Sequence, residues 1–400
     1  MAQSKAMKIR YFTTSIEVIV LVGILVSVGQ AGNWAEFAIW PATDEQQAPD
    51  IWGNIVVWQQ FVTEYGDYDI YIADINNPGE PAAFVIGDAN DQTNPAVYED
   101  IVVWQDYVVW EGSADWDIRA ADINDLDEPQ IFAITDIADN NECNPAIHGN
   151  TVVWEDGQAG DLNIFGADIT DLGNPAEFQI AAFEHDQQSP SIYRTTVVWQ
   201  DNFFGDWDIY AADIWQRNKP VDAAVSYIEK DQQSPAIWGN IVVWQDNFFG
   251  DWDIYAADIS DFEMLRQADP NNIIEFAVAA NEFSQTNPDI DGNIIVWQDN
   301  RNNNWDIFGY NLTTRKEFQI TDDSHDQTNP AISGSVVVWQ DNRNGNSEIY
   351  AAVLDGPEVA WCTSGMAGDI NRDCIIDFED FALMASQWLE CYLEPAQACR

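Results

Sequence analysis

One block of residues recurs seven times along this chain of 400 residues. It reads I-V-V-W-Q-D in its most regular copies, and its tryptophan marks the register: Trp58, Trp104, Trp154, Trp199, Trp244, Trp297 and Trp339. Successive tryptophans lie 42 to 53 residues apart, a spacing that suits one four-stranded propeller blade per repeat. Helical repeats of this length would show an apolar period of about 3.6 residues, and the chain does not show one. The repeat therefore predicts a ring of seven β-blades.

Each copy carries signals for four strands. Residues 234 to 259 supply three of these strands: a proline-led strand, a β-branched run into tryptophan and an alternating strand. A Gly-Asn turn joins the first strand to the second, and a turn rich in Asx and Gly joins the second to the third. A fourth strand is predicted before each block, as at Glu177 to Ile180. The repeats open on such a fourth strand, Glu36 to Ile39, and end on a third strand, Glu348 to Val353. We therefore expect the N-terminal strand to complete the last blade and close the ring.

The repeat resembles the TolB-like, WD-related propeller repeat over about residues 35 to 356. The resemblance rests on the order Pro, apolar residue, Gly-Asn, apolar-apolar-Trp, Gln-Asp and then Trp-Asp-Ile-Tyr. It implies a binding platform, because such propellers serve as interaction scaffolds and, more rarely, as enzymes. The continuous V-V-W run also suits a strand buried on both faces. We expect the seven tryptophans to pack between neighbouring blades.

The N-terminus has the three parts of a secretory signal peptide. Basic residues precede an apolar run from Ile16 to Val28, and the small-residue segment Gly29-Gln30-Ala31 follows. Because Glu17 interrupts the run and a membrane span needs about 20 apolar residues, we expect cleavage after Ala31 and no stable membrane span afterwards. The predicted domains are a signal peptide at 1–31, the propeller at 32–358 and a tail at 359–400. The protein is expected to be secreted or on the cell surface, with the periplasm as an alternative.

Charge narrows the range of partners. The chain has 68 Asp and Glu against 15 Lys and Arg, a net charge of -53. Such a charge repels nucleic acid phosphates and anionic membrane surfaces, so nucleic acid is excluded as a partner. Two interpretations stay open at this stage: solubility in a salty medium, and attraction of divalent cations.

The tail contains one calcium-loop pattern, D-I-N-R-D-C-I-I-D-F-E-D, at residues 369 to 380. Oxygen ligands are expected from the side chains of Asp369, Asn371, Asp373, Asp377 and Asp380 and the backbone carbonyl of Ile375. An amphipathic helix is predicted to follow. The alternative is an acidic turn that holds no metal.

The loop and helix are similar to a type I dockerin repeat, which implies calcium as cofactor and a cohesin-like partner. Two features depart from that pattern: Cys374 occupies the loop position that is usually Gly, and there is a single loop where a full dockerin has two. Four cysteines lie in this tail and are predicted to form disulfides, for which three connectivities are open.

Two sets of propeller residues are candidates for ligand contact. Tryptophan precedes an Asp-Ile pair at the start of several third strands, and its amphipathic ring suits sugar stacking: Trp116, Trp207, Trp252 and Trp305. Trp52 and Trp238 at the first hairpin belong to the same candidate set. Glutamine recurs where the innermost strand begins, as Gln187, Gln232 and Gln327, with counterparts Gln46, Gln92, Gln285 and Glu142. Packing and turn formation are the alternative roles of both sets. The D-N-x-x-G-D-W-D turns contain enough oxygen atoms for calcium, but Asx residues favour turns unaided.

No catalytic residue is assigned. His148, His185 and His325 do not form an evident metal cluster in the predicted ring, and the chain lacks a Gly-x-Ser-x-Gly elbow and a His-Glu-x-x-His pair. The predicted function is a non-catalytic extracellular binding module: the propeller recognises a polysaccharide or protein, and the calcium-dependent tail anchors it to a partner. The alternative is a polysaccharide hydrolase or lyase, with its site in the irregular segments Ser260 to Asn272 or Asp106 to Asp115. The expected fold class is all-β: a seven-bladed propeller of four-stranded blades, followed by a small α-helical calcium-loop segment.

Overall fold

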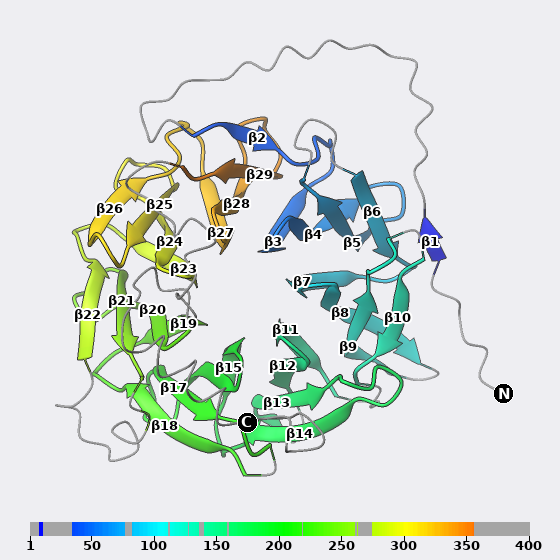
Figure 1. Ribbon diagram of the computed structural model, residues 1–400, viewed down its shortest axis with the longest axis horizontal. Helices are drawn as coiled ribbons and strands as arrows, with labels where there is room; N and C mark the ends of the chain where they lie inside the picture. Colours follow the sequence, from blue (N-terminus) through cyan, green and yellow to red (C-terminus); the bar gives the residue numbers. More distant parts are fainter. Residues whose placement is uncertain are drawn as a thin grey trace, which may run out of the picture.

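The computed structural model describes residues 8–10, 34–76, 82–110, 113–126, 128–135, 140–157, 160–217, 219–260, 262 and 274–355. Within these residues the chain is a seven-bladed, all-β propeller of four-stranded blades, as predicted (Figure 1). The predicted calcium loop and its helix lie outside the described residues, and so does the signal peptide apart from residues 8–10. In the described part of the chain, no helix is long and apolar enough to cross a membrane.

The blades follow one another along the chain, and each is an antiparallel meander that runs outward from the central channel (Figure 1). Blade 1 contains β3 (Gln46–Trp52), β4 (Ile55–Val62), β5 (Asp67–Asp74) and β6 (Ala82–Gly87), with β1 (Lys8–Arg10) paired to the outer edge of β6. Blade 2 contains β7 (Gln92–Tyr98), β8 (Ile101–Trp110), β9 (Ser113–Asp122) and β10 (Gln130–Ala133). Blade 3 contains β11 (Glu142–His148), β12 (Thr151–Asp156), β13 (Asn163–Asp168) and β14 (Ala176–Ala181). Blade 4 contains β15 (Gln187–Tyr193), β16 (Thr196–Asp201), β17 (Asp208–Asp213) and β18 (Val221–Ser226).

The remaining blades repeat this order. Blade 5 contains β19 (Gln232–Trp238), β20 (Ile241–Asp246), β21 (Asp253–Asp258) and β22 (Ile274–Ala279). Blade 6 contains β23 (Gln285–Asp291), β24 (Ile294–Asp299), β25 (Asp306–Asn311) and β26 (Lys316–Gln319). Blade 7 contains β27 (Gln327–Ser333), β28 (Val336–Asp341) and β29 (Glu348–Val353), and its fourth strand is β2 (Glu36–Ala38) from the N-terminal end of the propeller.

The hydrophobic core is divided among the blade interfaces. The described residues form seven clusters of buried apolar side chains, and each joins residues of two adjacent blades. The seven repeat tryptophans are all 0% exposed, which confirms their predicted packing between blades. Each blade therefore depends on its neighbours for most of its buried apolar surface.

The residue that follows the tryptophan, which is glutamine in six blades and Glu155 in blade 3, joins each blade to the next. Its side-chain oxygen accepts a hydrogen bond of 2.7 to 3.1 Å from a backbone N–H in the innermost strand of the following blade. The pairs are Gln59 with Asn94, Gln105 with Asn144, Glu155 with Ser189, Gln200 with Ser234, Gln245 with Asn287, Gln298 with Asn329, and Gln340 with Ala48. The donor residue has φ between 49° and 53° and lies in a β-bulge before a proline. Asn occupies four of these seven positions, because Asn tolerates this left-handed conformation better than most residues.

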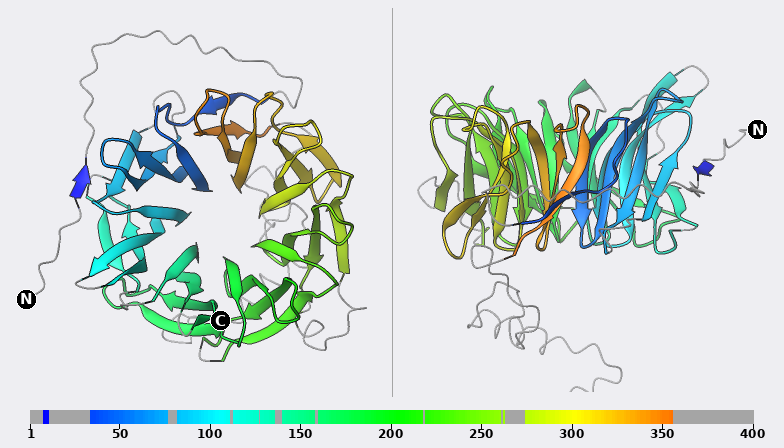
Figure 2. Two further views of the ribbon diagram at one scale, coloured as in Figure 1. Left: turned by 180° about the vertical axis from the view of Figure 1, so that it is seen from behind. Right: turned by 90° about the horizontal axis from the view of Figure 1, so that it is seen from above.

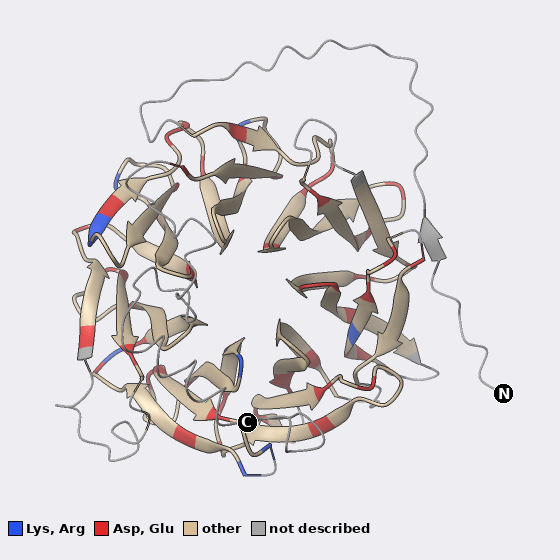
Figure 3. Ribbon diagram, in the orientation of Figure 1, with Lys and Arg blue, Asp and Glu red and all other residues tan. Residues whose placement is uncertain are grey.

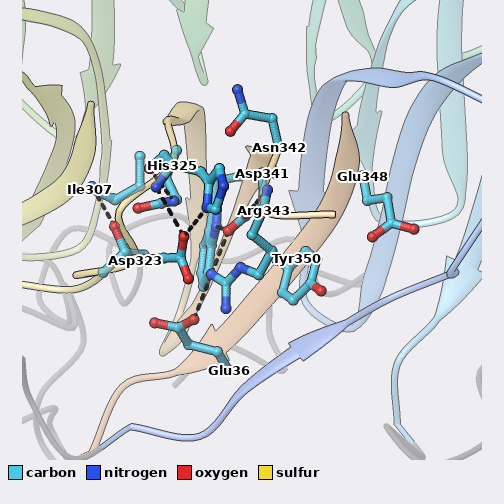
Figure 4. Close-up of polar contacts among 12 residues, drawn as sticks. Glu36, Ile307, Asp323, His325, Asp341, Asn342, Arg343, Glu348 and Tyr350 are labelled. Carbon is cyan, nitrogen blue, oxygen red and sulfur yellow. Dashed lines mark hydrogen bonds and ion pairs between the residues drawn. The ribbon is translucent and has the colours of Figure 1, made fainter. Parts of the chain in front are cut away.

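The predicted ring closure is confirmed. β2 pairs antiparallel with β29, with Phe37 opposite Ala351. Arg343 strengthens this junction, because its guanidinium contacts Glu36 on β2 at 2.7 Å and also bonds to Asp341 (Figure 4). The same guanidinium lies 4.4 Å from the centroid of the Tyr350 ring. One side chain thus connects the two ends of the propeller sequence.

The Arg343→Met variant is expected to lose about 1–3 kcal/mol of stability, because it leaves the buried Asp341 carboxylate without its charged partner. Urea unfolding measures the loss, and limited proteolysis reports opening of the blade 7 edge. The exposed Arg315→Met variant is the control. Equal stability of the two variants would show that the Arg343 ion pairs contribute nothing to closure.

Candidate functional site

The propeller has two faces with different chain segments (Figure 2). We call the face at which the innermost strand of each blade begins the entry face. The face at which that strand ends is the exit face. Because the strands of a blade are antiparallel, the entry face carries the turns between second and third strands and the connections between blades. The candidate residues Trp207, Trp252, Gln187 and Gln232 lie at the entry face.

Blades 4 and 5 present the same turn on the entry face. Residues 201 to 208 and residues 246 to 253 both read D-N-F-F-G-D-W-D. The first Asp of each turn accepts a hydrogen bond from the backbone N–H of the first Phe, at 2.9 Å in blade 4 and 2.7 Å in blade 5. The glycines, Gly205 and Gly250, have φ of 96° and 106°, a region that L side chains adopt only with strain. The two turns are therefore rigid copies of one motif on neighbouring blades.

Both turns expose their paired phenylalanines. Phe203 and Phe204 are 57% and 66% exposed, and Phe248 and Phe249 are 42% and 71% exposed. Within each pair the rings meet edge to face, with centroids 4.7 Å and 5.0 Å apart. Exposed aromatic rings in a repeated, rigid turn are typical of a recognition surface rather than of chance exposure.

The same turn in blades 6 and 7 has arginine in place of the first phenylalanine. Arg301 folds back onto its blade, where it bonds to Asp299 and Glu317 and lies 4.2 Å from the centroid of the Phe308 ring. Arg343 does the same against Asp341 and Tyr350. The turn thus folds with either residue type, so its conformation does not require the exposed phenylalanines of blades 4 and 5.

Connections between blades add further apolar side chains to this sector. Phe183, Ile228 and Phe283 precede the innermost strands of blades 4, 5 and 6 and are all exposed. The Phe183 ring stacks on His185, whose ring in turn lies 4.7 Å from Phe203. We name these exposed residues together the entry-face patch: Phe183, Phe203, Phe204, Ile228, Phe248, Phe249 and Phe283.

The four tryptophans that precede the Asp-Ile pairs, which were predicted to contact ligand, are half-buried at the entry face. The backbone carbonyls of Trp207, Trp252 and Trp305 each accept a hydrogen bond from the first residue of the next blade's innermost strand, at 2.6 to 2.7 Å. Trp116 instead packs against Tyr107, at 5.1 Å between ring centroids. Trp207 and Trp252 belong to the turns that carry the phenylalanine pairs. Ligand contact by these tryptophans stays a prediction.

The recurring glutamines have a structural role in this arrangement. Gln187, Gln232 and Gln327 are 0% exposed, and their side-chain amides donate to the backbone carbonyls of His185, Lys230 and His325. Each amide thereby holds the connection that enters its blade. The alternative role, ligand binding, stays a prediction, and it would require these buried amides to become accessible.

Glu142 takes the place of that glutamine in blade 3. It is 0% exposed, and its Oε1 atom has no hydrogen-bond partner in the described residues. Burial, and then the charges of Asp156 and Asp117, raise its pKa to about 8. The neighbouring Cys143 is free and half-buried, and burial raises its pKa to about 12.

The Glu142→Gln variant is expected to be more stable than the parent, by about 1–3 kcal/mol above pH 8. Because the folded state raises the pKa, it favours the neutral acid. The penalty is therefore absent below pH 4.5 and grows as pH rises from 4.5 to about 8. Thermal unfolding between pH 4 and 9 measures this difference. The reverse change, Gln232→Glu, should create a similar penalty, and a pH-independent difference would contradict the assignment.

The turn acids also have perturbed pKa values. Burial, and then the charges of Asp206, Asp201 and Asp231, raise the pKa of Asp208 to about 7. Among the described residues, no group of three or more His, Cys, Asp or Glu side chains is placed to hold a metal ion. The hydrogen bonds of Asp201 and Asp246 support the turn-forming role of these Asx residues. The predicted calcium ligands of the tail lie outside the described residues.

The segments proposed for an enzyme site differ in what the structure describes. The segment from Asp106 to Asp115 was expected to be irregular, but β8 and β9 pair in register from Ile101 opposite Asp122 to Trp110 opposite Ser113. This hairpin is a regular extension of the second and third strands. Most of the segment from Ser260 to Asn272 lies outside the described residues.

Comparison with solved structures places the chain among β-propeller proteins by fold. A puromycin-hydrolyzing peptidase of Mycobacterium tuberculosis matches with a TM-score of 0.59 and 12% identity, over 81% of this chain and 57% of the peptidase. An oligogalacturonate lyase of Vibrio parahaemolyticus matches with a TM-score of 0.56 and 11% identity, over 82% of this chain and 95% of the lyase. TolB of Acinetobacter baumannii matches with a TM-score of 0.45 and 12% identity, over 66% of this chain and 62% of TolB.

No protein-family profile matches the chain, and no curated protein matches it. Identities of 12% or less support a shared fold and no shared activity. The chain also spans little more than half of the peptidase. The structure therefore defines the chain as a seven-bladed β-propeller. The surface residues of this chain are the evidence for its function.

Proposed function

We propose that this protein is a secreted, non-catalytic binding module whose entry face recognises a neutral polysaccharide. The observation that carries the proposal is the pair of identical turns on blades 4 and 5, each exposing two phenylalanines. The predicted tail would anchor the module to a partner through calcium. That part of the proposal rests on residues 359–400 and on their resemblance to a dockerin.

A repeated surface motif suits a ligand with repeated units. Two copies of one turn on adjacent blades offer two equivalent aromatic contacts, so a polymer that engages both gains affinity by multivalency. The rings are large, partly rigid and apolar, and a pyranose ring presents C–H groups that pack against such a face. The neighbouring half-buried Trp207 and Trp252 supply aromatic surface at the base of the same turns.

Charge argues for a neutral glycan. Asp and Glu residues are spread around the ring, whereas Lys and Arg residues are sparse (Figure 3). The turns themselves contain Asp206 and Asp251, and the connections beside them contain Glu184 and Glu229. A polyuronate would be repelled by this field at low ionic strength. The ligand class is therefore expected to differ from the acidic substrate in the name of the oligogalacturonate lyase.

The test is a binding panel scored for retention and for product together. The purified protein is incubated with neutral polysaccharides (cellulose, xylan, mannan) and with anionic ones (polygalacturonate, alginate), each with calcium and with EDTA. Retention on a neutral polymer without released sugar ends is the expected result, and EDTA should leave this propeller binding unchanged. Release of reducing or unsaturated ends would make the protein an enzyme, and retention on anionic polymers alone would refute the neutral-ligand proposal.

A further inference from the structure

A collar of aromatic rings lies at the exit end of the central channel. Five consecutive innermost strands end in an aromatic residue: Trp52, Tyr98, His148, Tyr193 and Trp238. Neighbouring ring centroids lie 4.2, 4.4, 4.8 and 4.8 Å apart in that order, and Trp238 returns to within 6.4 Å of Trp52. The collar therefore surrounds the channel axis from five different blades, and its rings contact one another.

Two carboxylates lie behind the collar, in a cavity of about 240 Å³ that the aromatic rings also line. Asp50 belongs to β3 and Asp289 to β23, on the two blades that flank blade 7. Each accepts one hydrogen bond of 2.8 Å from a backbone N–H of the following blade, Val97 for Asp50 and Ile332 for Asp289. The equivalent positions in the other blades are occupied by alanine or serine, so the two acids are exceptions to the repeat.

The charges around this cavity favour a cation. Burial raises the pKa of Asp50 to about 6, and burial together with the charge of Asp50 raises that of Asp289 to about 7. Asp291, also lining the cavity, accepts a hydrogen bond from Gly334. Burial and then the charge of Arg194 lower the pKa of His148 to about 4, so its ring is neutral at pH 7.

The position of Arg194 and a second cavity in the channel determine how a ligand would reach the collar. Arg194, the nearby cation, lies 5.3 Å from the centroid of the Tyr193 ring and lines a different pocket of the exit face. A second cavity of about 420 Å³ occupies the entry half of the channel and shares Pro190 with the cavity behind the collar. The approach from the entry face is lined by the Asn, Ser and Pro residues of the strand bulges.

We propose that the channel cavity behind the collar binds an organic ammonium group. Aromatic faces attract ammonium cations through their quadrupoles, and this attraction strengthens when water is excluded. The carboxylates of Asp50 and Asp289 supply the opposite charge in the same cavity. An inorganic cation would use the acids alone, whereas an alkylated ammonium would contact acids and rings together.

The test uses choline and its uncharged isostere 3,3-dimethylbutan-1-ol with the full protein, measured by titration calorimetry and tryptophan fluorescence. Choline is expected to bind saturably at pH 8, at least about tenfold tighter than the isostere, a difference of about 1.4 kcal/mol. Its affinity should fall as pH drops from 8 to 5, because Asp50 and Asp289 become protonated. Equal binding of the two probes, or no saturable binding of choline at millimolar concentration, would overturn the proposal.

Matched variants separate this site from the fold and from the glycan surface. Asp289→Asn keeps an oxygen for the Ile332 N–H but removes the charge, and it should weaken choline binding at least about tenfold. Asp222→Asn, an exposed change of equal charge on β18, should leave it unchanged. If both variants bind choline like the parent, Asp289 does not form the site. Because the entry-face patch lies on other residues, its loss should spare choline binding, so either proposal can fail alone.

Discussion

A variant with Phe203, Phe204, Phe248 and Phe249 all changed to alanine should lose about 30-fold or more of its affinity for the neutral glycan. Each exposed aromatic contact is worth about 0.5–1.5 kcal/mol, and about 1.4 kcal/mol corresponds to tenfold in affinity. Four such contacts therefore amount to about 2–6 kcal/mol, and the lower end of that range corresponds to about 30-fold. Affinity electrophoresis or depletion on insoluble polysaccharide measures the loss.

Folding should be unaffected by the same four changes. The side chains are 42% to 71% exposed, and surface substitutions usually alter stability by less than about 0.5 kcal/mol. Trp215→Ala is the matched control, because Trp215 is an exposed aromatic residue on the exit face. The half-variants Phe203→Ala/Phe204→Ala and Phe248→Ala/Phe249→Ala test whether one chain spans both turns. If either half loses as much as the full variant, the two turns act together, whereas full retention in all variants would move the ligand elsewhere.

The second large effect is expected in the core. Trp199→Ala should destabilise the protein by about 3–5 kcal/mol, the cost of deleting a large buried aromatic side chain. Trp199 is 0% exposed and packs with Val153, Ile164 and Ile180 of blade 3 as well as with residues of its own blade. The change therefore removes contacts on both sides of one blade interface.

Chemical denaturation followed with two probes distinguishes unfolding of blade 4 alone from unfolding of the whole propeller. Because every blade shares its core with two neighbours, we expect a single shifted transition rather than separate unfolding of blade 4. Trp215→Ala again serves as the control and should shift the midpoint little. A Trp199→Ala protein as stable as this control would contradict the role of the interface clusters as the main source of stability.

The repeat allowed much of this fold to be predicted. A tryptophan inside a β-branched run can be buried on both faces only between packed sheets, so its sevenfold recurrence predicts seven blade interfaces. The order of strand signals predicts that β2 completes blade 7. These predictions succeed because each depends on local pattern and on the need to bury apolar surface and sheet edges, which act alike in every blade.

The candidate site was predicted less well. Pattern reasoning selected the tryptophans and glutamines because they recur, but residues that recur in every blade are those that the common architecture uses. The glutamines proved to be buried, whereas the turn with a pair of exposed phenylalanines occurs in blades 4 and 5. The sequence did contain a signal for the exposed phenylalanines: blades 6 and 7 have arginine at the turn position where blades 4 and 5 have the first phenylalanine.

Other features depend on contacts between residues far apart in the chain. The repeat pattern alone determined the all-β class, the number of blades and the way the ring closes, because these follow from local periodicity repeated at even spacing. Only the folded ring determined which glutamine reaches which bulge, and how five strand ends from Trp52 to Trp238 meet around Asp50 and Asp289. Those side chains are brought together by the sevenfold closure of the blades, because only the closed ring brings strand ends that are far apart in the chain into contact.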